Sequence, residues 1–275
     1  IKAIIFACPT ATSACLFRHM IKLCKYWILG SVYSSPTRIV GGAPTTIDRY
    51  PSIVQVESLG VFSGVWGQSC AANILTSRFV LSAAHCFAGI FYHPENRRIR
   101  AGSTYRNSGG IVSYVQRENN HPSYGSNGAD GDISVVTLIT PLVYSPVVQA
   151  GTIIVQGADV PDNTPVVHTG WGATSVRPAS DVLQDVTIYT INRELCAARY
   201  QATLFPQIVS ENMICVGLLD VGGADACQGD SGGPLYYGNI IIGVVSWGQS
   251  CAQAQFPGVN TRVASYTDWI VANVV

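Results

Sequence analysis

Short strand-like runs alternate with turn residues along most of the chain. Runs of this kind, bounded by glycine, proline and small polar residues, are typical of β-strands. They are Ile53–Val56, Phe79–Leu81, Ile111–Val115, Ile133–Leu138, Val166–His168, Met213–Val216 and Ile240–Val245. Two helices are expected beside them, one capped by Asn192 and reaching Tyr200, and a terminal helix Tyr266–Val275 capped by Ser265. The pattern predicts an all-β protein with a C-terminal helix.

Length and composition predict one functional region. The residues from Ile39 to Val275 are apolar-rich and punctuated by glycine and proline. They suit one all-β unit, or two small barrels packed closely together, rather than two independent domains. We therefore expect a leader at residues 1–38 and a single domain at residues 39–275.

Residues 1–38 have two interpretations. A start at Met20 would give a basic segment with Lys22 and Lys25 and a short apolar core at Tyr26–Val32, as in a signal peptide, followed by an activation peptide. A fragment, or read-through of untranslated message, is the alternative. The apolar runs are too short and interrupted for a membrane span, so no membrane partner is expected.

The decapeptide Asp225–Pro234, DACQGDSGGP, carries the candidate chemistry. It places Ser231 between glycines, but a serine hydroxyl is a poor nucleophile at neutral pH and needs a base and an orienting acid. His85 in LSAAHC and Asp132 in GDISVVTL supply those two types of side chain. Each signal is weak alone, and their conjunction predicts a serine nucleophile activated by histidine.

These motifs, in the order His85, Asp132, Ser231, with SWG after them, resemble the trypsin/chymotrypsin family of serine endopeptidases over Ile39–Val275. The resemblance implies two six-stranded antiparallel β-barrels packed together, with the catalytic cleft between them and a crossover near residues 140–165. Ser231 would attack the scissile carbonyl, His85 would take and return the proton, and Asp132 would hold the imidazole.

The same resemblance implies an oxyanion hole beside the nucleophile. The backbone N–H groups of Gly229 and Ser231 would donate to the developing oxyanion, along a backbone path that needs Gly229 and Gly232. Ser246 would hydrogen-bond the buried Asp132.

The resemblance also implies a pocket for a basic side chain. Its residues would be Asp225, Ala226, Ser246, Trp247, Gly248 and Gly258. Asp225 would face the substrate cation at the base, and the two glycines would leave room for a long side chain, so cleavage after Arg or Lys is expected. Many trypsins carry serine where this chain has Ala226, and the missing hydroxyl predicts a preference for Arg.

Activation is expected at Arg38, within TRIVGG. Cleavage there would create an α-amino group on Ile39, and its ammonium would pair with the buried Asp230 and order the oxyanion hole and the pocket. Pairing should raise the pKa of this ammonium above its ordinary value of about 7.7–8.0, so the active state would be favoured below the raised pKa and lost as pH rises through it. Because His85 must be neutral to act as base, an alkaline optimum is expected.

Charge is distributed unevenly. All 16 acidic residues follow residue 38, but only 11 of 16 basic residues do, so the net charge there is 11 − 16 = −5, which disfavours a nucleic-acid partner. No lysine follows Lys25. Arginine stays charged above about pH 12, whereas lysine titrates near about 10.4. In its lack of lysine the chain resembles the lysine-poor digestive trypsins of the alkaline caterpillar midgut. Compositional drift or codon bias is the alternative explanation for the missing lysines.

Six cysteines follow residue 38, and six allow fifteen pairings. The family resemblance selects Cys70–Cys86, Cys196–Cys215 and Cys227–Cys251, which implies an oxidising, extracellular location. A metal site at these cysteines is disfavoured because no CxxC pair is present.

We expect no cofactor and no metal ion. The stretch Ser103–Glu118, where many vertebrate trypsins bind calcium, offers Ser103 and Gly110 in place of acidic ligands. The expected partners of a monomer are protein and peptide substrates and proteinaceous serine protease inhibitors. A regulatory cascade protease, or a catalytically weak homologue that serves as a binding module, is the alternative function.

Overall fold

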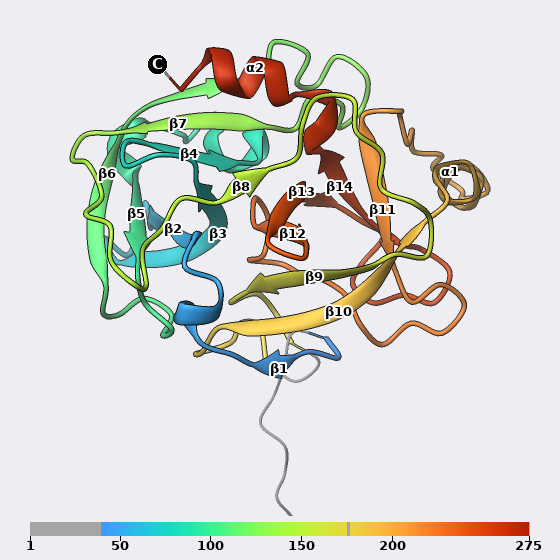
Figure 1. Ribbon diagram of the computed structural model, residues 1–275, viewed down its shortest axis with the longest axis horizontal. Helices are drawn as coiled ribbons and strands as arrows, with labels where there is room; N and C mark the ends of the chain where they lie inside the picture. The colour runs from blue at the N-terminus through green and yellow to red at the C-terminus, as the bar shows by residue number, and fades with distance from the viewer. Residues whose placement is uncertain (1–39, 175–176, 275) are drawn as a thin grey trace, which may run out of the picture. The chain divides into compact units, whose positions relative to one another are not determined.

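The computed structural model describes residues 40–174 and 177–274, so the predicted leader, Arg38 and Ile39 lie outside the described residues. The first of two barrels (Figure 1) is closed by six antiparallel strands in the order β2-β3-β4-β7-β6-β5. These strands are β2 (Ile53–Leu59), β3 (Trp66–Ile74), β4 (Phe79–Ser82), β5 (Arg97–Ala101), β6 (Ile111–Asn120) and β7 (Ser134–Leu138).

The second barrel is a closed ring in the order β9-β10-β11-β14-β13-β12. Its strands are β9 (Pro165–Gly170), β10 (Gln184–Ile191), β11 (Met213–Gly217), β12 (Pro234–Tyr237), β13 (Ile240–Trp247) and β14 (Gly258–Arg262). Two short strands join its edges, β1 (Ala43–Pro44) against β10 and β8 (Thr152–Ile153) parallel to β13. The predicted pair of six-stranded antiparallel barrels is therefore confirmed, and the chain crosses between them after β7, where the sequence predicted it.

Both predicted helices exist, but one predicted cap is wrong. Helix α1 (Arg193–Gln201) begins after Asn192, whose side chain accepts a hydrogen bond from the Leu195 N–H at 3.1 Å, as predicted. Helix α2 is shorter than predicted, Thr267–Ala272, and Tyr266 is its N-cap. Ser265 does not cap it, because Ser265 ends a preceding 3₁₀ turn, Val263–Ser265, and its hydroxyl lies 3.1 Å from Arg262 Nη1.

The barrel interiors are apolar. Buried side chains from the six strands of the first barrel include Val54, Ile74, Val80, Ile99, Val115 and Leu138, and those of the second include Val166, Ile188, Val216, Leu235 and Ile242. Burying one such side chain contributes about 1.5–3 kcal/mol relative to leaving it in water. These two cores fix the positions of the loops that leave the strand ends.

Three disulfides join the predicted pairs, Cys70–Cys86, Cys196–Cys215 and Cys227–Cys251. Each closes a loop of 16, 19 or 24 residues in sequence separation, and cross-links over loops of this size stabilise a fold by about 3 kcal/mol in the chain-entropy description. Across residues 40–174 and 177–274, neither helix has the length and apolar character needed to cross a membrane.

Candidate active site

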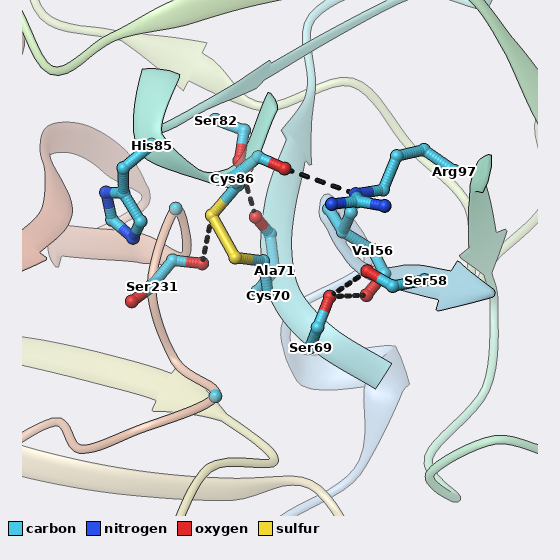
Figure 2. Close-up of a disulfide and its surroundings, with 12 residues drawn as sticks. Val56, Ser58, Ser69, Cys70, Ala71, Ser82, His85, Cys86, Arg97 and Ser231 are labelled. Carbon is cyan, nitrogen blue, oxygen red and sulfur yellow. Dashed lines mark hydrogen bonds between the residues drawn. A yellow bond between two sulfur atoms is a disulfide. The ribbon is translucent and has the colours of Figure 1, made fainter. Parts of the chain in front are cut away.

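Three predicted residues come together at the junction of the barrels. His85 lies in a 3₁₀ turn, Ala84–Phe87, directly after β4, and Asp132 lies just before β7. Ser231 precedes β12 of the second barrel, and its carbonyl accepts a hydrogen bond from the Ala71 N–H of β3 at 2.8 Å. Figure 2 shows the His85 and Ser231 side chains beside the Cys70–Cys86 disulfide, whose Cys86 Sγ lies 3.6 Å from the Ser231 carbonyl.

Asp132 holds His85 through both carboxylate oxygens. Oδ1 accepts from the His85 backbone N–H at 2.9 Å, and Oδ2 lies 2.7 Å from His85 Nδ1 and 2.5 Å from the Ser246 hydroxyl. Asp132 is 2% exposed, and an ionised carboxylate can only accept. The proton of a neutral His85 ring therefore lies on Nδ1, which leaves Nε2 free to accept a proton.

The loop that carries Ser231 depends on two glycines in the left-handed region. Gly229 has a φ of 96° and Gly232 a φ of 79°. A Cβ on Gly232 would lie 2.4 Å from the Ala71 carbonyl and 2.1 Å from Ser82 Oγ, so no side chain fits there. Neither the Gly229 nor the Ser231 N–H has an acceptor within the part of the chain that the structure describes. Two free backbone donors next to a serine hydroxyl are suited to an oxyanion.

Gln68 is a residue that the sequence analysis missed. Its Nε2 donates to the Gly229 carbonyl at 2.6 Å and to the Cys70 carbonyl at 3.0 Å, and its side chain comes from β3 of the first barrel. The preceding peptide is held as well, because the Gln228 carbonyl accepts from the Ala173 N–H at 2.7 Å. Gly229 is thus fixed on both sides, and Gln68 is a positioning residue for its N–H.

Replacing Gln68 with methionine should lower kcat about tenfold, because one hydrogen bond holding the loop is lost while the side-chain length is kept. KM for a small substrate should change by less than about twofold, since Gln68 does not line the pocket. Steady-state kinetics and thermal unfolding check this, with the exposed Gln149→Met as the matched control. An equal fall in both variants, or a fall in stability that accounts for the lost activity, would contradict the positioning role.

A pocket of about 220 Å³ opens beside Ser231. All six residues predicted for it line it, namely Asp225, Ala226, Ser246, Trp247, Gly248 and Gly258, and so do His168 and Asn260, which were not predicted. A Cβ on Gly258 would lie 2.6 Å from Asp225 Oδ1, so glycine keeps the carboxylate accessible from this wall.

Asp225 is buried in this pocket with limited compensation for its charge. It is 5% exposed and accepts from the Ala226 N–H at 2.8 Å and the Ala252 N–H at 3.3 Å. Burial raises the pKa of Asp225 to about 7, although these two backbone hydrogen bonds act in the opposite direction. The pocket therefore holds a carboxylate that a cation would stabilise.

Asp230 occupies a separate, fully buried position beside Ser231 in the sequence. Its carboxylate accepts from the Gly172 N–H at 2.8 Å and the Cys227 N–H at 3.0 Å, and burial raises its pKa to about 6. A Cβ on Gly172 would lie 2.5 Å from Asp230 Oδ2, so the close approach requires glycine. The described chain begins beside Asp225, whose N–H donates to the Val40 carbonyl at 3.1 Å.

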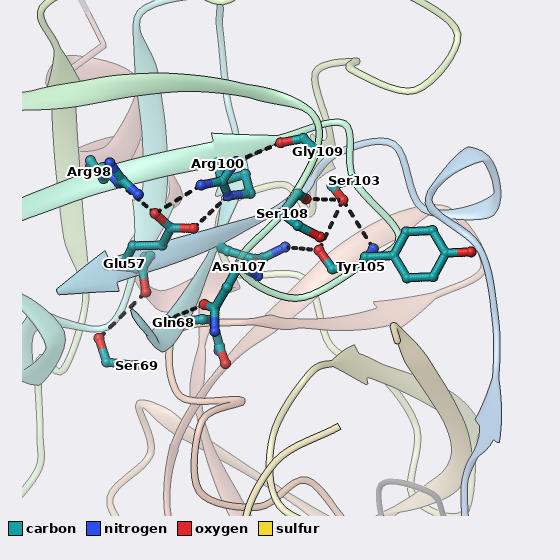
Figure 3. A network of polar contacts seen from close by, with 12 residues as sticks. Glu57, Gln68, Ser69, Arg98, Arg100, Ser103, Tyr105, Asn107, Ser108 and Gly109 are labelled. Atoms are coloured by element: carbon teal, nitrogen blue, oxygen red, sulfur yellow. Dashed lines mark hydrogen bonds and ion pairs between the residues drawn. The ribbon is translucent and has the colours of Figure 1, made fainter. Parts of the chain in front are cut away.

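The loop that would bind calcium in the vertebrate relatives is tied by side chains of this protein (Figure 3). Ser103 Oγ lies 2.9 Å from the Tyr105 carbonyl and 2.6 Å from the Ser108 carbonyl. Arg100 Nη1 donates to the Gly109 carbonyl at 2.6 Å, and its Nε donates to the buried Glu57 carboxylate at 2.5 Å. A guanidinium and a hydroxyl thus contact the carbonyl oxygens of this loop.

The cysteines near His85 do not form a thiolate site. Cys70, Cys86 and His85 are the one group of potential metal ligands found among the described residues, and the two sulfurs are joined in a disulfide. Disulfide sulfurs are not thiolates, which are the form that binds metal ions.

Two antiparallel barrels with histidine, aspartate and serine converging at their junction define a serine endopeptidase of the two-barrel class. The sequence pattern of the Trypsin family matches residues 39–270, and the chain belongs to this family. It is 42% identical to "Trypsin, alkaline C" of Manduca sexta over 250 residues, 89% of this chain and 94% of the relative. It is 42% identical to "Trypsin CFT-1" of Choristoneura fumiferana over 262 residues, which are 92% of this chain and 97% of the relative. It is 34% identical to "Vitellin-degrading protease" of Bombyx mori over 256 residues, which are 90% of this chain and 92% of the relative.

Proposed function

We propose that this trypsin-like endopeptidase cleaves peptide bonds after Arg and Lys. The observation that carries the proposal is Asp225, a buried carboxylate in the pocket that opens beside Ser231. An Arg guanidinium meets a carboxylate with two parallel hydrogen bonds, and a Lys ammonium meets it as a point charge. Neutral side chains would leave this carboxylate desolvated and unpaired, so they are poor substrates.

In the proposed reaction, Ser231 Oγ bonds to the scissile carbonyl carbon as its proton passes to His85 Nε2. Asp132 keeps the His85 proton on Nδ1 and stabilises the imidazolium. The N–H groups of Gly229 and Ser231 donate to the oxyanion, and His85 returns the proton to the leaving amine. Water then attacks the acyl-enzyme, giving its proton to His85, and Ser231 is regenerated.

The proposal includes activation by cleavage after Arg38. The new ammonium of Ile39 pairs with Asp230, whose burial and raised pKa are those of a carboxylate in need of a cation. Among the described residues, no cationic side chain forms an ion pair with Asp230. This pairing orders the oxyanion hole and the pocket, so the uncut chain is a zymogen.

We propose further that the enzyme is secreted, digestive and monomeric, works in an alkaline gut lumen, and is a target of proteinaceous serine protease inhibitors. Three disulfides support an extracellular location. The absence of lysine after Lys25 supports an alkaline fluid, and the printed name of the Manduca sexta relative includes the word alkaline.

Mass spectrometry of peptides released from a mixed protein substrate tests the proposed function. The activated enzyme should cut after Arg and Lys, Arg more than Lys, with rates that rise from pH 7 into the alkaline range. Cleavage after apolar residues would contradict the pocket assignment. A single cut in one substrate protein would favour the cascade protease, and absence of labelling at Ser231 by an active-site serine reagent would favour the binding module.

Ala226→Ser should reduce the Arg-to-Lys ratio of kcat/KM about three- to tenfold, because a hydroxyl beside Asp225 gives a lysine ammonium an added acceptor of about 0.5–1.5 kcal/mol. Ala226 is 9% exposed and its own N–H already contacts Asp225. Matched Arg and Lys peptides measure the ratio in both enzymes. An unchanged ratio would show that residue 226 does not tune the preference.

A further inference from the structure

Two buried polar residues of the pocket have no part in the steps above. Asn260 lies on β14, is 1% exposed, and its Oδ1 has no hydrogen-bond partner within the described chain. His168 lies on β9 and is 1% exposed. Both line the same pocket as Asp225. A buried acceptor without a partner costs about 1–3 kcal/mol, so the Asn260 oxygen needs a hydrogen-bond donor, which a buried water can supply.

The hydrogen bond of His168 defines its tautomer. Its Nδ1 lies 3.2 Å from the Pro234 carbonyl, and a carbonyl can only accept, so the proton is on Nδ1. Burial lowers the pKa of His168 to about 4, so the ring is neutral across the neutral and alkaline range. Its Nε2 is then an acceptor. The pocket therefore contains the Asp225 carboxylate and two neutral acceptors, Nε2 of His168 and Oδ1 of Asn260.

The position of Asn260 on its strand relates it to Asp225. Successive side chains of a strand point to opposite faces, so Asn260 and Gly258 share one face of β14. A Cβ on Gly258 would lie 2.6 Å from Asp225 Oδ1, which places the carboxylate against that face. The Asn260 amide thus faces the side of β14 on which Asp225 lies.

We propose that Asn260, together with His168, holds water next to Asp225, and that this water receives the ammonium group of lysine substrates. A water that donates one hydrogen to Asn260 Oδ1 and the other to Asp225 turns its lone pairs toward an incoming cation. The pocket has room for it, because its cavity volume is about 220 Å³ and about 10–15 Å³ of such volume is enough for one water. Asn260 is then a specificity-determining residue, and this inference rests on the proposed cleavage after basic residues.

Lysine depends on such a water more than arginine does. The planar guanidinium can contact the carboxylate directly through two N–H groups, whereas the ammonium is a compact, strongly hydrated point charge. Ala226 offers Asp225 only its backbone N–H, so no hydroxyl at that position receives the ammonium. Water on Asn260 supplies the acceptor that the alanine side chain lacks.

Asn260→Leu tests the proposal, because leucine has nearly the shape of asparagine but cannot hold the water. We expect kcat/KM for a Lys peptide to fall about tenfold, the effect of one lost hydrogen bond to a charged group, and that for the matched Arg peptide to fall less than about threefold. Competitive inhibition by butylammonium should weaken in the same proportion relative to a guanidine inhibitor. Asn260→Ser, which keeps a hydroxyl and room for water, should stay near the original ratio.

The exposed Asn239→Leu, in the β12–β13 turn, is the matched control and should leave the ratio unchanged. Equal losses on Arg and Lys in Asn260→Leu would overturn the inference. If that variant does not fold, a crystal structure of the unmodified enzyme with butylammonium decides, and absence of a water bonded to both Asn260 and Asp225 overturns it. An unmodified enzyme that cuts after neither Arg nor Lys would instead overturn the proposed function.

Discussion

Replacing Asp132 with asparagine is expected to lower kcat about 10⁴-fold, the loss known for the corresponding substitution in this family, with little change in KM. The reason lies in the three hydrogen bonds of the carboxylate. Asp132 accepts from the His85 backbone N–H, from His85 Nδ1 and from Ser246 Oγ. An asparagine amide has one oxygen and one NH₂ group, so it cannot accept at both ends.

The geometry decides which hydrogen bond is reversed. The His85 backbone N–H can only donate, so the amide oxygen of the introduced asparagine would face it, and the NH₂ group would face His85 Nδ1. Nδ1 must then accept, and the ring proton moves to Nε2. Nε2 can no longer take the Ser231 proton. The fold should be retained, because the side chain keeps its shape and Ser246 can turn its hydroxyl to accept.

Active-site titration, kcat and thermal unfolding together measure this effect. Asp181→Asn is the matched control, since Asp181 is 76% exposed and pairs with Arg177 on the surface. The control should retain full activity. A loss of less than about tenfold in Asp132→Asn, with a normal unfolding temperature, would show that His85 does not act as the base.

The fold was predictable where a strand is an apolar run, and less so where its partners are distant in sequence. Strand β5 reads RRIRA, and its Arg98 and Arg100 both donate to the buried Glu57 of β2, 41 and 43 residues away. No local sequence pattern predicts that these two arginines pair with Glu57. Strand β10, QDVTIYTI, does alternate in burial, but its inward positions include Gln184 and Thr190, so it does not read as an apolar run.

The residues of the candidate site also differ in how well the sequence predicts them. His85, Asp132 and Ser231 stand in motifs that can be recognised from the sequence, whereas Gln68 and Asn260 lie in strands that contain other polar residues and no motif. Their importance depends on which loop or pocket the strand meets. Gln68 reaches Gly229 across 161 residues, and only the packing of one barrel on the other brings them together. Asn260 stands in a strand that reads GVNTR, beside Thr261 and Arg262, so no sequence signal singles it out.

Replacing Asp225 with serine should lower kcat/KM for Arg and Lys substrates roughly 10²- to 10⁴-fold, corresponding to about 3–5 kcal/mol for removing one partner of a buried ion pair. The kcat for a neutral ester substrate, which does not need the carboxylate, should change far less. Asp220→Ser is the matched control, because Asp220 is 65% exposed and pairs with Arg199 away from the pocket. Equal losses on basic and neutral substrates would point to a damaged loop rather than a lost specificity contact.

The pH dependence of cation binding gives a second, independent measurement on Asp225. Burial raises the pKa of this carboxyl to about 7, so in the free enzyme the neutral acid predominates below that value and the carboxylate above it. Because its pKa is higher in the folded protein than in the unfolded chain, the Asp225 carboxyl stabilises the fold at low pH, and this contribution is lost as pH rises through the folded pKa. A bound cation should therefore stabilise the enzyme most above pH 7. The affinity for benzamidine, measured by calorimetry, should therefore fall about tenfold for each pH unit below about 7.

Asp230 is a second buried carboxyl, and its pKa is raised to about 6 when no cation lies beside it. The proposed pairing with the Ile39 ammonium would lower that pKa, so the contribution of Asp230 must be separated from that of Asp225. Asp225→Ser separates the two, because it removes the pocket carboxylate and leaves Asp230 in place. Its weak residual binding should lose the decline that begins near pH 7. If the decline near pH 7 persists in this variant, the titrating group is not Asp225, and the carboxylate would not be the group that recognises the substrate cation.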